Sequence, residues 1–572
     1  MRIFLARCSS AVFSLTLAMG LAVPCSAAIN IDLSYVDQQS NEYERFSNWV
    51  NQAVNGNPGY DFSAIDAAYM YRITGQTQYA NLAVQMVEQQ VADAEAAIAA
   101  GETPEVAHDS YLAVGTMISS VAITYDWCSS FVTTSQKARW AAYTEQTIFN
   151  VWNPDQAVWG SRPASWSGWS IENPANNYFY SFLEATMYWS QAANSAPWMQ
   201  FLDVVKIPLL ENYFATLVGG GSQEGTGYGL SHKKLFNLYR MWRDSTGEDI
   251  ANQNSHLTDS ILWWIHATVP TLDRTAAIGD QSRVSEPEIY DYHRDLMLEA
   301  RKMTLDPTAQ ANASWWLHNI STQEMENGFN LRHDLLPAGS AGSPPAELVY
   351  HAAATGQLFA RTSWDRSAMW LQFAAGPYIE SHAHQDQGSF TLYQDTWLAV
   401  TENIWSHSGI QQGTEVNNML RFEHNGTIVR QHTDTTSSMT VTPGGGGSVQ
   451  AVANLTPAYD GDSAVQSWTR TIDFQGHTLT VHDTYATGSG TQAIFQVNVP
   501  VQPSISGSTA TAGALKITVL SPANATLQAV DWTNEDGDYG SGWRIDISGG
   551  TGDYLVKLST EVTEEVFASG FD

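Results

Sequence analysis

Histidines gather in one short stretch of the chain. Six of the fifteen fall between residues 351 and 432, where even spacing would place about two. The densest segment reads Ser-His-Ala-His-Gln-Asp-Gln-Gly-Ser-Phe, at residues 381–390. If this segment is a strand, His382 and His384 share one face, which suits two metal ligands or one ligand beside a catalytic imidazole. Two exposed strand histidines are the alternative that the residues alone leave open.

A glycine-rich segment, Gly-Gly-Gly-Ser-Gln-Glu-Gly-Thr-Gly-Tyr-Gly at residues 219–229, precedes a stretch of helical pattern. It lacks the Gly-Lys-Ser/Thr ending of a phosphate-binding loop and follows a helix, where a nucleotide-binding fold needs a strand. We expect it instead to bring Glu224 and Tyr228 to the mouth of a helical domain. A plain interhelical turn is the alternative.

Amides and aromatic rings crowd a third segment, Trp-Ser-Gly-Trp-Ser-Ile-Glu-Asn-Pro-Ala-Asn-Asn-Tyr-Phe-Tyr at residues 166–180. Asn173 or Asn176 can cap the helix that follows, and this structural role is one explanation. The functional explanation is that asparagine amides bind a carboxylate while an indole such as Trp169 stacks on a sugar face. The chain carries 21 Trp and 24 Tyr, more than a core alone requires.

Helices are expected to position the segments at 166–180 and 219–229. Between residues 32 and 321 apolar residues recur at helical spacing in successive pairs of runs, which predicts antiparallel helical hairpins. Such tandem hairpins suit either a superhelix or a closed ring. The predicted pairs are 62–73 with 79–87, 111–128 with 137–151, 178–191 with 199–217, 232–243 with 255–269, and 290–303 with 309–320.

The pattern changes after residue 336. Residues 337–345, rich in Pro, Gly and Ser, are typical of a linker, and short alternating runs separated by turn residues follow. This pattern predicts an antiparallel β-sandwich. We therefore assign residues 29–336 to a helical domain and residues 346–572 to the sandwich, in a multidomain α + β chain.

The first 28 residues have the composition of an export signal. Arg2 and Arg7 precede an apolar run, and small residues end at Ala28. We expect a secreted or periplasmic protein. Pro24 fits poorly with lipid attachment at Cys25, and the remaining chain would keep Cys128 alone and form no internal disulfide. No later run reaches the roughly 20 apolar residues of a membrane span.

The charge balance limits the partners. The formal net charge is -32, which becomes -34 without the signal segment. A nucleic-acid-binding protein needs a basic face to neutralise phosphates, so that class is excluded. An acidic polysaccharide is not excluded, because a few polar and basic groups in a cleft can dominate the local field.

Together the three segments resemble, in order and spacing, those of the heparinase II/III-like polysaccharide lyases. The resemblance implies an (α/α) toroid followed by an antiparallel β-sandwich. Residues 224–228 resemble the family's Glu-Gly-x-x-Tyr loop, which implies that Tyr228 is catalytic. The His-x-His motif implies that His382 reaches the active site. Asn177 resembles the family's toroid asparagine, and Tyr178 stands where the family often has histidine.

The activity implied is β-elimination on a uronate-containing polysaccharide of the alginate or glycosaminoglycan type. Asn177 and His382 would neutralise the uronate carboxylate, because the adjacent C5 proton is otherwise too weakly acidic. Tyr228 would take the C5 proton and return a proton to O4, which requires positive groups near its hydroxyl. The candidate substrate-binding residues are Asn176, Tyr178, Glu224, Trp169 and Arg240.

The resemblance also implies one structural divalent metal, with zinc expected, and no organic cofactor. Its expected ligands are His384, Glu402 and His424. Glu402 is chosen because Thr401 occupies the position at which the family has aspartate.

Two other functions stay open at this point. One is an inverting glycoside hydrolase with Glu172 and Glu224 as acid and base, and the other is a non-catalytic glycan-binding protein. The sequence leaves the polysaccharide and the oligomeric state open. The small number of bases near the motifs argues against a densely sulfated substrate; they are Lys233, Lys234, Arg240, Arg243, Arg361, Arg366 and Arg421.

Overall fold

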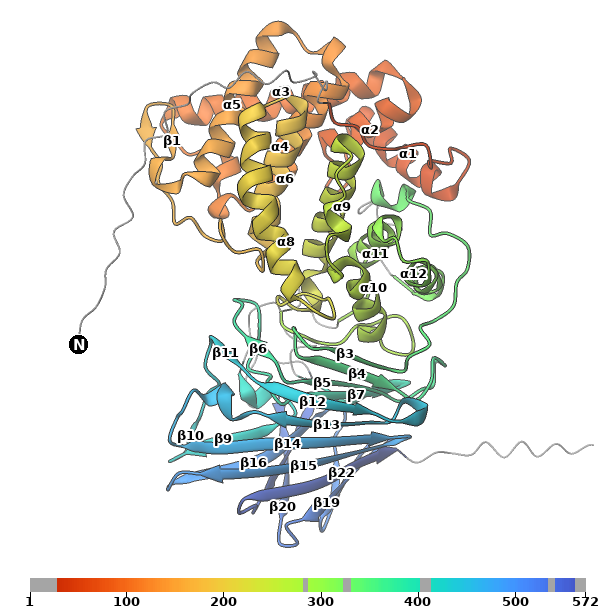
Figure 1. Cartoon of the computed structure of the whole chain (residues 1–572), viewed down its shortest axis with the longest axis vertical. Coiled ribbons are helices and arrows are strands. Elements are labelled where there is room, and N and C mark those ends of the chain that lie inside the picture. The colour runs from red at the N-terminus through yellow and green to blue at the C-terminus, as the bar shows by residue number, and fades with distance from the viewer. Residues whose placement is uncertain (1–27, 281–286, 323–330, 402–412, 533–540, 561–572) are drawn as a thin grey trace, which may run out of the picture.

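The computed structural model describes residues 28–280, 287–322, 331–401, 413–532 and 541–560. Figure 1 shows the helices gathered in one half of the molecule and the long strands in the other. Nearly all of the expected export signal, with Cys8 and Cys25, lies outside the described residues. Cys128 is buried and unpaired with another cysteine.

Antiparallel hairpins build the helical half. The inner helices α2, α4, α6, α9 and α11 contact one another in that order, and the helices between them in sequence return along the outside. The chain enters through α1 (Asn41–Val54). The hairpins are α2 (Ala64–Thr74) with α3 (Thr77–Ala100), α4 (Val114–Trp127) with α5 (Thr134–Trp152), α6 (Asn177–Ala192) with α7 (Ala196–Phe201) and α8 (Ile207–Thr216), α9 (Gly229–Thr246) with α10 (His256–Ala267), and α11 (Asp291–Met303) with α12 (Pro307–Asn319).

Because every inner helix is followed by an antiparallel outer helix, the inner helices are parallel and start at the same end of the toroid. Local sequence marks these starts: Ser63 and Asp66 form a capping box at α2, and the Asn176 side chain accepts from the backbone N–H of Tyr178 at α6. The positive ends of several helix dipoles therefore meet at one rim.

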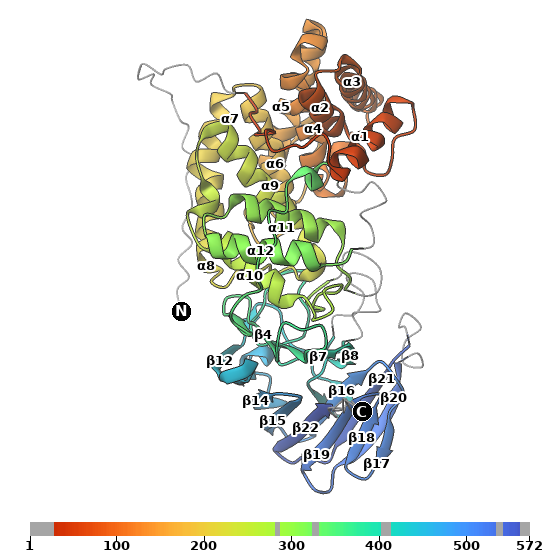
Figure 2. The ribbon, with the colours of Figure 1, turned by 90° about the vertical axis from the view of Figure 1, so that its right-hand side faces the viewer.

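Three antiparallel sheets make up most of the other half (Figure 2). Their strand orders, with bounds, are as follows. The largest sheet runs β12 (Ser438–Pro443), β13 (Val449–Asn454), β14 (Val465–Gln475), β15 (Thr478–Thr487), β22 (Asp553–Thr560), β19 (Leu515–Ser521), β18 (Thr509–Ala512), β17 (Ser504–Ser506). The second runs β10 (Thr427–Ile428), β9 (Leu420–His424), β16 (Thr491–Val499), β21 (Trp543–Ser548), β20 (Thr526–Asp531). The third runs β3 (Val349–Ala352), β4 (Gln357–Arg361), β5 (Trp370–Ala374), β7 (Phe390–Gln394), β8 (Thr396–Ala399).

The third sheet joins the two halves, because its two faces belong to different cores. On β4, Phe359 packs in the core of the toroid and Leu358 in the core of the sandwich, as the two-residue period of a strand requires. Arg361, fully buried on the same strand, donates from Nη2 to the carbonyls of His266 (3.1 Å) and Thr268 (2.7 Å) at the end of α10. The relative placement of toroid and sandwich is thus set by a shared sheet.

The predicted helical toroid followed by an antiparallel β-sandwich is confirmed. The last helix ends at Asn319 and the third sheet begins at Val349, with the expected linker at 337–345 between them. The short pairs β1 (Val158–Trp159) with β2 (Arg162–Pro163), and β6 (Pro377–Tyr378) with β11 (Thr435–Thr436), were not expected. In the described part of the chain, no helix has the length and apolar character to span a bilayer.

Arg240 does not line a binding surface, contrary to its expected role in substrate binding. It is 2% exposed, and its Nε and Nη2 donate to Glu299 on α11 at 2.6 and 2.8 Å. Asn237 on α9 donates to the same carboxylate at 3.1 Å. The face of α9 that carries Arg240 therefore packs inside the toroid, and the arginine neutralises a buried acid there.

Replacing Arg240 by methionine should strongly destabilise the toroid, because Glu299 would keep a buried charge without its cation. The expected loss is ~3–5 kcal/mol in the free energy of unfolding. The matched change Arg139→Met removes an arginine that is one-third exposed and paired with Glu88 and Glu95, and should cost about 0–1 kcal/mol. Urea unfolding followed by tryptophan fluorescence measures both; equal losses would contradict the role assigned to the Arg240 pair.

Candidate active site

The candidate site lies where the starts of α6 and α9 meet the loop between β6 and β7. Tyr228 ends a short 3-10 turn (Thr226–Tyr228) directly before α9. His382 comes from the sandwich side, in the β6–β7 loop. The two rings stack with centroids 4.1 Å apart and planes inclined by 30°. A tyrosine from the toroid and an imidazole from the sandwich are thereby held in direct contact.

Asp280, from the toroid, fixes the orientation of both histidines. Its Oδ2 lies 2.9 Å from His382 Nδ1, and its Oδ1 lies 2.6 Å from His384 Nε2. The backbone N–H of Asp280 also donates to the carbonyl of His382 at 3.0 Å. Asp280 is 2% exposed and His384 4% exposed, so little water competes for these contacts. With Nδ1 engaged, His382 turns its other ring nitrogen towards the site.

The condition that residues 381–390 form a strand is not met, since β7 begins only at Phe390. His382 and His384 lie in a loop, and they meet the two oxygens of one carboxylate instead of sharing a strand face. The backbone carbonyl of His382 accepts a hydrogen bond from Asp280 of the toroid, so it is not available for strand pairing inside the sandwich.

Close backbone contact explains one glycine of the 219–229 segment. Gly225 has φ +99° and forms a bridge with Gly279, and a Cβ at Gly225 would lie 2.0 Å from the carbonyl oxygen of Ile278. Only glycine fits this approach without displacement. The contact brings Glu224 and Asp280, the neighbours of the two glycines, to the same point.

Glu224 connects the site residues and is itself fully buried. Its Oε1 accepts from the backbone N–H of Asn177 at 3.0 Å and lies 3.8 Å from His382 Nε2. Its Oε2 accepts from the Ser231 hydroxyl at 3.1 Å. Burial, and then the nearby charges of Glu380 and Asp280, raise the pKa of Glu224 to about 8. Glu224 thus positions its neighbours as a neutral carboxylic acid at pH 7, and it was expected instead to contact substrate.

The two asparagines that begin α6 have different roles. Asn176 is buried, and its Nδ2 donates to Glu380 Oε1 at 3.0 Å, as Asn173 Nδ2 does to Glu380 Oε2 at 3.0 Å. Asn176 therefore caps the helix, which is the structural role considered for it from the sequence, and it also connects the toroid to Glu380 of the sandwich. Asn177 is half-buried, and its Oδ1 has no hydrogen-bond partner among the described residues. Because that oxygen is buried, the amide nitrogen is the part of Asn177 that can donate to a ligand.

Two aromatic candidates, Tyr178 and Trp169, differ in their surroundings. The hydroxyl of Tyr178 donates to Asp109 Oδ1 at 3.0 Å; burial, with the neighbouring Asp109, raises the pKa of Tyr178 to about 12. Asp109, Ser110 and Tyr111 all have positive φ, so the loop that presents Asp109 is strained. Trp169 is 45% exposed and its substrate-binding role stays a prediction.

The expected structural metal stays a prediction. Among them, no group of three or more His, Cys, Asp or Glu side chains is arranged to hold a metal ion. His384 is engaged by Asp280, and the ring nitrogens of His424 lie 2.8 Å from Thr491 Oγ1 and 2.9 Å from Asn425 Nδ2. Glu402, the third expected ligand, lies outside the described residues. We therefore assign no chemical step to a metal.

Sequence reasoning missed three acidic residues that organise the site: Asp109, Asp280 and Glu380. None belongs to a motif, and Asp280 lies 102 positions from the histidine that it orients. Glu380 offered one signal, since it stands two residues before His382 in a chain segment already singled out. Asp280 becomes visible only when the toroid and the sandwich are placed together, and Asp109 only when its loop is packed beside the start of α6.

The raised pKa of Glu224 has a consequence for stability. Above the unfolded-state pKa near 4.5, the folded protein keeps a proton that the unfolded chain has lost, so stability falls as pH rises towards 8. Glu224→Gln removes this proton, so the free energy of unfolding should fall less between pH 5 and pH 8 than in the wild type.

Urea unfolding at several pH values measures this difference. Glu44→Gln, at an exposed position on α1, should leave the wild-type pH dependence unchanged. Parallel curves for the wild type and Glu224→Gln would show that Glu224 is already ionised in the folded protein at neutral pH.

No family model matches the chain, and no curated protein matches it by sequence. Similarity is found with solved structures. A heparan sulfate lyase, HepC from Pedobacter heparinus, has a TM-score of 0.58 and 13% identity, with 93% of this chain and 85% of that chain covered. A heparinase III has a TM-score of 0.61 and 10% identity, with 93% and 87% covered. A chondroitin AC lyase from Streptomyces coelicolor, in complex with chondroitin sulphate, has a TM-score of 0.55 and 10% identity, with 92% and 81% covered. At these identities the likeness establishes the fold, which is that of the heparinase-like polysaccharide lyases.

Proposed function

We propose that this protein is a polysaccharide lyase that cleaves a uronate-containing polysaccharide by β-elimination. The observation that carries the proposal is the contact of Tyr228 with His382, beside Asn177, in a boundary site whose histidine is oriented by Asp280. These residue types supply a base, a cation and a neutral amide donor, which are the groups that elimination next to a carboxylate needs.

Neutralising the uronate carboxylate is the first requirement. While it is negative, it opposes the development of further negative charge at C5. The Asn177 amide nitrogen forms no hydrogen bond to the described residues and can donate to the carboxylate. His382 is held at Nδ1 by Asp280, which leaves the Nε2 edge for an anion. Asn177 and His382 together would bind the two carboxylate oxygens.

The proton transfers then fall to Tyr228. Its phenolate oxygen takes the C5 proton, the C5–H electron pair forms the C4=C5 double bond, and the C4–O4 bond breaks. The same hydroxyl returns the proton to O4, which leaves as the new chain end. An imidazolium at His382, stacked on the tyrosine ring, would favour the phenolate by its proximity.

The acidic side chains next to the site do not prevent an anionic sugar from binding there. Glu224 has a pKa of about 8 and so is mostly neutral at pH 7, while Asp280 is compensated by two histidines. The parallel inner helices add positive partial charge at the rim where Asn177 and Tyr228 stand. The local field can therefore accept an anionic sugar although the chain as a whole carries a formal charge of -32.

The fold supports an acidic polysaccharide as substrate. The solved structures of the same fold are named as heparan sulfate and chondroitin lyases, and one contains chondroitin sulphate. We propose by extension that this protein acts on a uronate-containing polymer of the glycosaminoglycan or alginate type. It would do so outside the cell if residues 1–28 direct export.

The two carboxylates that an inverting hydrolase would need, Glu172 and Glu224, are not placed to act as its acid and base. Glu172 is bound by the buried Lys206 at 2.6 Å, and the carboxylate is 69% exposed on its other side. Glu224 is fully buried behind Asn177 and Ser231. Two such groups cannot flank a glycosidic bond as acid and base, so elimination accounts better for the site.

Tyr228→Phe tests the proposal directly. Removing the hydroxyl removes both proton transfers, so the rate of formation of the C4=C5 chromophore, followed by ultraviolet absorbance, should fall at least ~10³-fold. Tyr125→Phe, near the opposite end of inner helix α4, is the matched control and should keep the wild-type rate. A fully active Tyr228→Phe variant would show that another group is the base.

Asp280→Asn tests the orientation of His382. The side chain keeps its shape but loses the charge that holds Nδ1, so kcat should fall ~10²-fold or more with a smaller change in KM. The pH profile of kcat should also shift, which a purely structural role for Asp280 would not produce. Asp126→Asn, where the carboxylate accepts from the backbone N–H of Ile29 at 2.8 Å, serves as control. An unchanged kcat and pH profile for Asp280→Asn would refute the positioning role.

A further inference from the structure

The first described residues of the chain pack into the core of the toroid. Ile29 is 3% exposed and Ile31 is 6% exposed, and both belong to the apolar core of the helical half. Ala28, directly before them, is only partly buried. The expected export signal ends at Ala28, and Ser26 and Ala28 are the small residues that a signal peptidase requires before its cut. The core of the toroid therefore starts directly after the expected cleavage point.

Hydrogen bonds tie the segment that begins at Ile29 to the ends of two inner helices. The Ile29 N–H donates to Asp126 Oδ2 at 2.8 Å, and the Ile29 carbonyl accepts from Trp127 Nε1 at 2.8 Å, both at the end of α4. Further along the segment, the N–H of Asp32 donates to Asp244 Oδ2 at 3.0 Å in the last turn of α9. The segment thus connects two inner helices that α6 separates.

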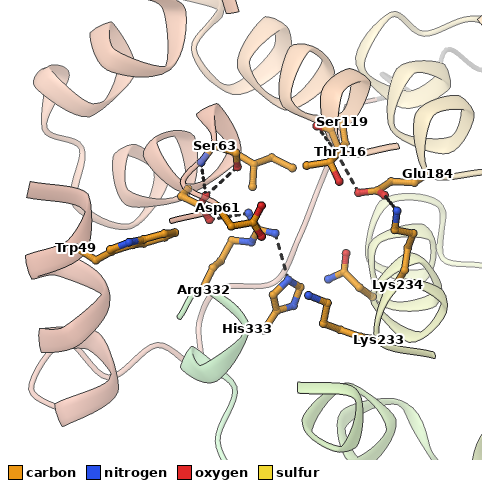
Figure 3. Close-up of a pocket in the computed structure, with 13 residues that line it drawn as sticks. Trp49, Asp61, Ser63, Thr116, Ser119, Glu184, Lys233, Lys234, Arg332 and His333 are labelled. Atoms are coloured by element: carbon orange, nitrogen blue, oxygen red, sulfur yellow. Dashed lines mark hydrogen bonds and ion pairs between the residues drawn. The ribbon is translucent and has the colours of Figure 1, made fainter. Parts of the chain in front are cut away.

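Asp126 differs from other acids of the toroid in having no cation beside it. Glu184 Oε2 lies 3.2 Å from Lys234 Nζ, and Figure 3 shows this pair. Glu299 is paired with Arg240 in the same way. Across the described parts of the chain, no basic side chain lies within ion-pair distance of Asp126, and the hydrogen bond that it accepts comes from a backbone N–H.

The surroundings of Asp126 favour a positive charge at this point. Burial raises the pKa of Asp126, while the Ile29 N–H and the more distant charges of Arg72 on α2 and Lys137 on α5 oppose that rise. Asp126 also stands in the last turn of α4, at the negative end of the helix dipole, and that turn contains no basic residue. A positive charge on the Ile29 nitrogen would offset both effects, because it would lie 2.8 Å from Asp126 Oδ2.

Cleavage of the Ala28–Ile29 peptide bond creates such a charge. A signal peptidase adds water across the bond: the C–N bond breaks, the water oxygen completes the carboxylate of Ala28, and both water protons end on the nitrogen of Ile29. The nitrogen changes from a neutral amide with one hydrogen to a primary ammonium with three. Its hydrogen bond to Asp126 becomes a charge-assisted one, which is the stronger kind.

We propose that residues 1–28 are cleaved off during export and that the new ammonium group of Ile29 forms an ion pair with Asp126, which completes the toroid. The inference rests on the expected export signal and does not depend on the proposed lyase activity. The uncleaved precursor lacks the pair and is less stable, so the chain reaches its full stability only after cleavage. The pair lies at the end of α4, away from the starts of the inner helices, and so leaves the candidate active site unchanged.

The first residue of the exported protein tests the cleavage point. The full chain is expressed with residues 1–28 in a bacterial host, and the protein recovered outside the cytoplasm is analysed by N-terminal sequencing and by intact mass. We expect Ile29 as its first residue. Any other first residue, or retention of residues 1–28, would overturn the proposal.

Urea unfolding at pH 7, followed by tryptophan fluorescence, tests the ion pair. A chain that starts at Ile29 is compared with one that keeps Ser26, Ala27 and Ala28 before it. The added residues return the Ile29 nitrogen to an amide, so the equilibrium constant for unfolding should rise at least ~5-fold. With Asp126→Asn in both chains this difference should disappear. Equal stabilities of the two chains with Asp126 in place would refute the pair.

Asp244→Asn is the matched control for Asp126→Asn. Asp244 accepts a backbone N–H of the same segment, but from Asp32, so the substitution should destabilise both chains equally and keep the difference between them. If Asp244→Asn abolished the difference as completely as Asp126→Asn, docking of the segment would be responsible and the ion pair would be excluded.

The pH dependence of the same difference identifies the charge on the nitrogen. An α-amino group has an ordinary pKa of about 8, and a carboxylate partner raises that pKa. The extra stability of the chain that starts at Ile29 should therefore be fully present at pH 7 and be lost as pH rises, falling below ~2-fold by pH 10. An undiminished difference at pH 10 would show that no titrating ammonium is involved.

Discussion

One carboxylate at the boundary between toroid and sandwich determines the geometry of the site. Asp280 is almost fully buried and uses each of its oxygens for a different histidine of the same sandwich loop. Two imidazoles in contact with its two oxygens offset the cost of removing this carboxylate from water. The contact with Asp280 holds His382 against Tyr228, because His382 lies in a loop and no strand pairing fixes its position.

Other contacts at and near the boundary support the same arrangement. Gly225 approaches the Ile278 carbonyl so closely that no side chain fits, which brings Glu224 beside Asp280. Glu380 accepts from Asn173 and Asn176, and Arg361 holds the end of α10. The candidate catalytic groups thus come from two structural units that share one sheet, and neither unit alone contains the complete set.

The sequence predicted the helices and strands and singled out Tyr228 and His382, which the structure brings into contact, but it did not reveal the residues that orient them. Apolar spacing predicted the helical hairpins because each helix buries one face, and the alternation on strands such as β4 is visible for the same reason. Tyr228, His382 and Asn177 stand in recognisable motifs. Asp280 belongs to no motif, because its role depends on a contact with a residue 102 positions away. The prediction that Arg240 binds substrate was wrong, because helical periodicity does not show whether a charged side chain faces solvent or a buried partner such as Glu299.

A crystal structure of the Tyr228→Phe variant with a bound uronate oligosaccharide tests the account most directly. The account predicts one uronate carboxylate within hydrogen-bonding distance of the Asn177 amide and the His382 ring, with C5 and O4 facing the ring of residue 228. An oligosaccharide bound with its carboxylate away from Asn177 and His382, or outside the boundary between toroid and sandwich, would contradict it.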